Sequence, residues 1–182
     1  MSGSATARYG LTVVATAVAY WLAFQFNEHV LFFTRFEDGV NWVYLPSGLR
    51  LTLVLVFGWP AAFGIACASV FLAAAPHPWS ALPHALVTGL ISGFAPLLAL
   101  LLSRRWLLLR EDLNGLDGRS LLLLAAVFAV TSAALHQLWY AWPHPSPDPF
   151  YSFAVMSLGD LAGSLIVLYL CRWSLLLWSP RA

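Results

Sequence analysis

The chain has 182 residues, of which 60% are hydrophobic and 9% are charged, and its net charge is +1. Soluble domains carry about a quarter charged residues, so this composition predicts a single integral membrane domain over residues 1–182, with no soluble output domain. The composition argues against nucleic acid as a partner, because such binding needs clustered Lys and Arg on one polar face.

Six apolar segments are predicted to form transmembrane helices, since a helix needs about 20 apolar residues to cross a bilayer. In chain order they cover Tyr9–Phe26, Leu45–Trp59, Pro60–Ala75, Leu82–Leu102, Ser120–Tyr140 and Tyr151–Cys171. The second and third segments are short, and only Gly58-Trp59-Pro60 separates them, so five crossings is the alternative to six. The predicted fold is an all-α, polytopic transmembrane helical bundle of about six helices.

The arginines gather on one side of this predicted bundle, at the two ends of the chain and in the link between the fourth and fifth helices. They are Arg8, Arg104, Arg105, Arg110, Arg119, Arg172 and Arg181. The positive-inside rule places that side, with both termini, in the cytoplasm. Six crossings satisfy this orientation, because both termini share a side only when the number of crossings is even.

The histidines fall on the opposite, outer side of the predicted bundle: His29, His77, His84, His136 and His144. Their spacing is irregular, and the chain has no Cys-x2-Cys or His-x3-His pattern, so no metal site is predicted. Motifs for nucleophilic, metal-assisted or phosphate chemistry are also lacking, and the chain is not expected to be an enzyme or to hold a cofactor.

Arg50 and Asp160 are charged residues inside apolar segments, where a charge costs at least about 2.5 kcal/mol and usually has a partner. At 1.5 Å per residue, Arg50 is expected about 7–8 Å and Asp160 about 13–14 Å below the outer helix ends. His136, at about 6 Å by the same rise, joins them. These three residues are predicted to line one outward-facing cavity.

Three interpretations of this cluster stay open. Arg50 and Asp160 form a structural ion pair, or Arg50 anchors a small polar or anionic ligand, or Asp160 and His136 couple proton movement to transport. Pro46, Ser47 and Gly48 are predicted to break the second helix beside Arg50, where a freed helix N-terminus would also favour anions. The spacing of Gly159 and Gly163 predicts close helix packing.

Two stretches resemble the bacterial membrane-associated sensor domain of the MASE type. They are residues 42–61, WVYLPSGLRLTLVLVFGWPA, and residues 158–163, LGDLAG. The family has a Trp-Pro-Pro-x-Gly-like element before an apolar helix that ends in Phe-Gly, and a Gly-Asp with a following Gly in a late helix. The pattern covers Asp160 but does not extend to Arg50.

The resemblance implies a sensory module of a bacterial inner membrane. Family domains are usually longer and feed a kinase, cyclase or phosphodiesterase domain. The resemblance therefore implies a free-standing, shortened module that signals through another protein, or one that has kept the fold for a different task. Another membrane protein or a homo-oligomer is the expected partner. The expected function is therefore a non-enzymatic sensory or accessory module that binds a ligand or partner in its outer half. A small transporter or a substrate-binding membrane subunit is the alternative.

Overall fold

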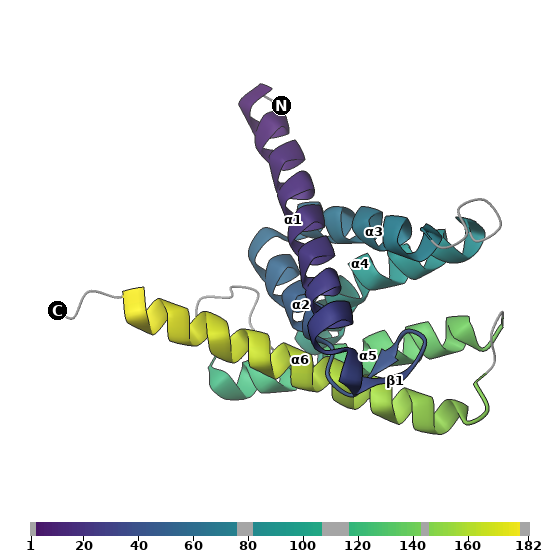
Figure 1. The fold of residues 1–182 in the computed structure, drawn as a ribbon. Helices are drawn as coiled ribbons and strands as arrows, with labels where there is room; N and C mark the ends of the chain where they lie inside the picture. The colour runs from purple at the N-terminus through teal and green to yellow at the C-terminus, as the bar shows by residue number, and fades with distance from the viewer. Residues whose placement is uncertain (1–2, 76–81, 107–116, 143–145, 179–182) are drawn as a thin grey trace.

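The computed structural model describes residues 3–75, 82–106, 117–142 and 146–178. Within these ranges the chain forms six α-helices, one short 3-10 helix and one two-stranded hairpin (Figure 1). The helices are α1 (Gly3–Val30), α2 (Leu45–Phe57), α3 (Trp59–Ala74), α4 (Leu82–Trp106), α5 (Gly118–Tyr140) and α6 (Pro149–Trp178). Four residues named in the orientation and histidine predictions lie outside the described residues: His77, Arg110, His144 and Arg181.

The predicted all-α membrane bundle is confirmed. By length and composition, four of the described helices can cross a membrane, over Ala5–Val30, Leu82–Arg105, Gly118–Tyr140 and Pro149–Ser174. Several helices run past the predicted segments, and α6 continues to Trp178. The apolar run marks what lipid can surround, whereas the helix ends only where its backbone hydrogen bonds stop.

The two short helices, α2 and α3, are joined at Gly58 alone. Trp59 and Pro60 open α3 instead of forming part of a three-residue link, because proline is favoured in the first turn of a helix. Gly58 has a φ of 63°, a left-handed conformation that glycine adopts without strain. With 13 residues, α2 is about 20 Å long, which is shorter than the hydrocarbon core of a bilayer.

The helix break predicted at Pro46, Ser47 and Gly48 is wrong, because these residues form the first turn of α2. Pro46 costs little there, since the first N–H groups of a helix have no partner within it. The backbone N–H of Ser47 donates to the carbonyl oxygen of Tyr44 at 3.2 Å. Arg50 therefore projects from a continuous helix, between its first and second turns.

The helices pack in a closed ring in the order α1, α3, α4, α5, α6, α2, and α2 contacts all five others. Glycines allow this close approach. A Cβ atom at Gly163 would overlap the carbonyl oxygen of Tyr44, and one at Gly159 would overlap that of Asn41. The predicted small-residue face of α6 thus lies directly against the start of α2 and the strand before it.

A hairpin between α1 and α2 covers one end of the bundle. Strands β1 (Arg35–Glu37) and β2 (Val40–Asn41) pair antiparallel after the 3-10 helix η1 (Phe32–Thr34). The turn is Asp38-Gly39, and Gly39 has a φ of 78°. The sequence prediction treated this segment as a link, although Asp-Gly is a strong hairpin signal. We call this end of the molecule the hairpin end.

At the opposite end, α5 begins behind a capping residue. Asp117 precedes the helix, and its Oδ1 accepts the backbone N–H of Ser120 at 2.8 Å. Hydrogen bonding by the Ser120 side chain and backbone lowers the pKa of this carboxyl. The cap fixes where α5 starts, and hence which of its residues, 23 in all, reach the hairpin end.

Candidate functional site

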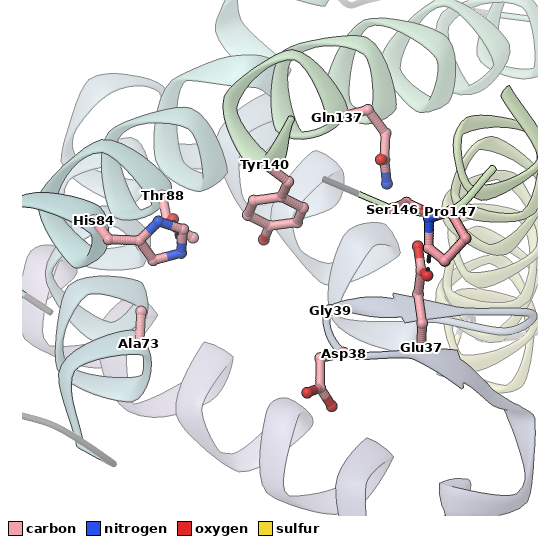
Figure 2. Close-up of a pocket in the computed structure, with 10 residues that line it drawn as sticks. All are labelled: Glu37, Asp38, Gly39, Ala73, His84, Thr88, Gln137, Tyr140, Ser146 and Pro147. Carbon is pink, nitrogen blue, oxygen red and sulfur yellow. Dashed lines mark hydrogen bonds between the residues drawn. The ribbon is translucent and has the colours of Figure 1, made fainter. Parts of the chain in front are cut away.

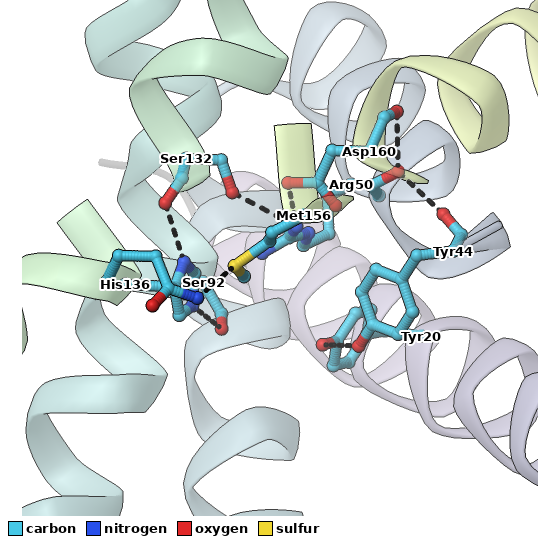
Figure 3. Close-up of polar contacts among 10 residues, drawn as sticks. Tyr20, Tyr44, Arg50, Ser92, Ser132, His136, Met156 and Asp160 are labelled. Atoms are coloured by element: carbon cyan, nitrogen blue, oxygen red, sulfur yellow. Dashed lines mark hydrogen bonds and ion pairs between the residues drawn. The ribbon is translucent and has the colours of Figure 1, made fainter. Parts of the chain in front are cut away.

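Arg50 is buried at the centre of the bundle, with 1% of its side chain exposed. Its Nη2 lies 3.4 Å from Asp160 Oδ2 on α6 and 3.3 Å from Ser132 Oγ on α5 (Figure 3). The guanidinium carbon also lies 5.4 Å from the ring centroid of Phe128 and 5.7 Å from that of Tyr44, within cation–π range. Three helices thus converge on one cation.

Asp160 is held from its backbone as well as through its side chain. Ser47 Oγ donates to the carbonyl oxygen of Asp160 at 2.9 Å, or to that of Tyr44 at 2.6 Å. The backbone N–H of Tyr44 donates to the carbonyl oxygen of Gly159 at 3.1 Å. These contacts fix α6 against the start of α2, and that position sets the separation of the two charges.

The Arg50–Asp160 pair leaves hydrogen-bonding capacity unused. Arginine and carboxylate groups often form two parallel hydrogen bonds, whereas one long contact joins this pair. Among the described residues, Arg50 Nε and Asp160 Oδ1 are buried and have no hydrogen-bond partner. The charges neutralise each other, but each group retains one atom without a hydrogen bond.

His136 on α5 is buried, and the structure fixes its tautomer. Nδ1 lies 2.8 Å from the carbonyl oxygen of Ser132, which can only accept, so Nδ1 carries the proton. Nε2 lies 3.2 Å from Ser92 Oγ on α4 and, in the neutral ring, accepts the hydroxyl proton. His136 therefore links α4 to α5 beside Arg50, and Ser132 bridges the two residues.

A cavity of about 370 Å³ opens from this cluster toward the hairpin end, and we call it the inner cavity. Arg50 and His136 line it, whereas Asp160 is not among its lining residues. Further polar and charged side chains line it: Tyr20, Glu28, Arg35, Asp38, Asn41, Tyr44, Ser69, Thr88, Ser92 and Tyr140. The sequence prediction that Asp160 lines the cavity is therefore wrong: Asp160 contacts the guanidinium of Arg50 but is not part of the lining.

A second cavity of about 530 Å³, the outer cavity, lies under the hairpin (Figure 2). Glu37 and Asp38 of the hairpin line it, together with His84 of α4 and Gln137 of α5. The two cavities adjoin, because five residues line both: Asp38, Gly39, Ala73, Thr88 and Tyr140. The two cavities thus lie side by side between the hairpin and Arg50.

The structure brings Arg50, Asp160 and His136 together, as their counted depths predicted. Pro46, Ser47 and Gly48 lie in the turn that precedes Arg50, and Gly159 and Gly163 lie on the facing side of α6. Within the described part of the chain, no group of three His, Cys, Asp or Glu side chains is placed to hold a metal ion.

Sequence reasoning missed most of the cavity wall. Tyr20, Tyr44 and Tyr140 are ordinary interfacial aromatics by sequence, and Ser92 and Ser132 are single hydroxyls in apolar runs. The signal that was available is the Asp38-Gly39 turn, which predicts a hairpin and therefore two carboxylates at the mouth of the site.

Comparison with known proteins returns no match: no protein-family model, curated protein or solved structure matches the chain. The resemblance to MASE-type sensor domains stays a prediction.

Proposed function

We propose that this chain is a non-enzymatic sensory or accessory module of a bacterial inner membrane. It binds a small polar ligand in the inner cavity and passes the occupancy of that cavity to another membrane protein. The observation that carries this proposal is Arg50, which is 1% exposed and yet lines a cavity of about 370 Å³. Ligand sites of small molecules typically have roughly 300–1,000 Å³ and a few convergent polar groups.

The loose pairing of Arg50 supports a binding role over a purely structural one. A structural pair gains most from two short hydrogen bonds, whereas Arg50 and Asp160 share one contact of 3.4 Å. Arg50 Nε has no partner among the described residues, and a guanidinium has only donors to offer. A ligand with an acceptor group supplies what this cation lacks, and Asp160 neutralises its charge.

The position of α2 supports a signalling role. This helix carries Arg50 and contacts each of the other five. A ligand that draws the guanidinium away from Asp160 changes the α2–α6 contact, and hence the packing of the ring. Signalling by this route needs two packing states for which the ligand has different affinities.

The arginines support the orientation. Arg104 and Arg105 end α4, and Arg119 begins α5, at the end of the bundle away from the hairpin. Under the positive-inside rule this end faces the cytoplasm, together with both termini. The inner and outer cavities then open toward the periplasm. The family pattern that the chain resembles includes Asp160, which is consistent with a sensory role.

Thiol labelling tests whether the cavity is reachable from outside the cell. The native cysteines, Cys67 and Cys171, are both exposed and are first replaced by alanine. Ala73→Cys, in the wall shared by both cavities, is expected to react with a membrane-impermeant thiol reagent added to intact cells. Ala99→Cys, fully buried in the apolar core, is the matched control and is expected to stay unlabelled. An unreactive Ala73→Cys would contradict the proposed cavity and its orientation.

The mass of the complex extracted gently from its native membrane tests the partner. A stoichiometric second membrane protein is expected. Migration as a monomer would contradict signalling through another protein.

A substrate-binding membrane subunit of a transporter is the second candidate. Asp160 favours it, because its Oδ1 has no hydrogen-bond partner among the described residues and buried carboxylates often mark ion-coupled pathways. Loss of uptake in Asp160→Asn with the fold intact would support transport, and normal uptake would contradict it.

A further inference from the structure

The two adjoining cavities carry opposite chemistry at their ends. Arg50 stands at the inner end, and Glu37 and Asp38 stand at the outer end. From this arrangement we propose that the ligand is a small zwitterion. Its cationic group lies beside the hairpin carboxylates, and its anionic group reaches Arg50. This inference rests on the proposed ligand-binding function and names the chemical class of the ligand.

The outer cavity is acidic. Two carboxylates, Glu37 and Asp38, line it, and the described lining residues include no Lys or Arg. Glu37 Oε2 accepts a hydrogen bond from Ser146 Oγ at 3.3 Å, and Asp38 has neither an ion pair nor a side-chain hydrogen bond within the described ranges. Arg35, which lines the inner cavity together with Asp38, is already paired with Glu28. The mouth therefore attracts a cation and repels a simple anion.

The inner end requires the opposite group. A guanidinium donates hydrogen bonds and accepts none, so Arg50 Nε needs an acceptor. A ligand with only a cationic group would bring no hydrogen-bond acceptor to the N–H groups of Arg50. A simple anion would satisfy Arg50 but would have to pass the two hairpin carboxylates. A molecule with both charges complements both ends, and it adds no net charge to a site enclosed by the membrane.

The connection between the two ends is polar and aromatic. Tyr140 lines both cavities, and Figure 2 shows it in the same space as the hairpin carboxylate of Glu37. Tyr20 and Tyr44 line the inner cavity, with their hydroxyl oxygens 3.3 Å apart. The hydroxyl groups of these tyrosines can bind the polar body of the ligand between its two charges.

The test compares probes that share a carbon chain and differ in charge. γ-Aminobutyrate, butyrate and butylamine are each titrated into the full chain in lipid nanodiscs, and binding is followed by the shift in the apparent melting temperature. Glycine and ε-aminocaproate extend the zwitterion series to shorter and longer charge separations. At least one zwitterion is expected to bind about tenfold more tightly than both single-charge probes, because it gains one further charged hydrogen bond.

Asp38→Asn assigns the cationic subsite. Asn suits the hairpin turn as well as Asp does, so the fold is retained. The variant is expected to bind the preferred zwitterion about tenfold more weakly, with butyrate binding unchanged or improved. Asp117→Asn removes the same charge at the far end of α5 and keeps a capping side chain, and it is expected to change neither affinity.

Three results would overturn the proposal that the ligand is a zwitterion. Butyrate could bind as tightly as every zwitterion, butylamine could bind as tightly as every zwitterion, or no probe could bind. Labelling of Ala73→Cys separates these failures from failure of the proposed function. A labelled cavity with no zwitterion preference removes this inference alone, whereas an unlabelled cavity removes both.

Discussion

Two arginine–carboxylate pairs in this protein show how location changes the role of the same chemistry. Arg35 and Glu28 pair at the hairpin end, where their side chains are 46% and 21% exposed. Arg50 and Asp160 pair inside the bundle, where both are 1% exposed. Water screens the first pair and solvates either partner alone, whereas nothing replaces a lost partner in the second. The outer pair is therefore dispensable, and the inner pair is needed as a unit.

Removing one member of the inner pair is expected to have the largest effect. Arg50→Leu and Asp160→Leu should each lower the free energy of unfolding by about 3–5 kcal/mol, because each leaves an uncompensated buried charge. The double variant should be more stable than either single variant. Equilibrium unfolding of the four proteins in detergent micelles measures this cycle, and additive losses would contradict the pairing.

The close approach of α6 to α2 holds the inner pair together and is expected to be the next most sensitive feature. Gly163→Ala adds a Cβ that overlaps the carbonyl oxygen of Tyr44, so α6 must shift, at a cost of about 1–3 kcal/mol. Gly10→Ala is the matched control on α1, where a Cβ meets nothing within 4 Å. It should be neutral or slightly stabilising, as alanine is in helices. Equal losses in unfolding experiments would show that the helix contact does not matter.

The hydroxyl beside the inner pair should have a smaller effect. Ser92→Ala removes the hydrogen bond to His136 Nε2 and leaves that buried nitrogen without this partner, at a cost of about 1 kcal/mol. Ser174→Ala on the exposed part of α6 removes a hydrogen bond to the carbonyl oxygen of Leu170 and should cost nothing measurable. Thermal unfolding in nanodiscs compares the two variants, and an unchanged Ser92→Ala would argue against a tightly held His136.

The outer pair should give the smallest change. Arg35→Ala is expected to lower the free energy of unfolding by about 0.2–1 kcal/mol, since exposed pairs contribute little. Salt screens exposed charges, so the difference from the wild-type chain should shrink as ionic strength rises. Unfolding curves at low and high salt test this prediction. A loss as large as that of Arg50→Leu would remove the contrast between the two pairs.

The sequence alone determined the class of the protein and identified the two charged residues inside its helices. A composition with 9% charged residues leaves little to solvate a soluble surface, so the membrane bundle follows from transfer energies. Arg50 and Asp160 stand out for the same reason, because a charge in an apolar run is costly and needs a partner. Counting residues along each helix was enough to place His136 near them.

Only the tertiary structure decided which helix is central and where the cavities lie. In a membrane, lipid is as apolar as a protein core, so an apolar residue does not reveal which of the two it faces. In their most apolar stretches, α1 has 11% of its residues buried and α4 has 50%, yet both are apolar along their length. The central place of α2, the 3.4 Å contact between Arg50 and Asp160, and the hairpin over the cavities arise from contacts between distant segments. Backbone packing at Gly159 and Gly163 brings those segments together, and local sequence does not specify the partner of such a contact.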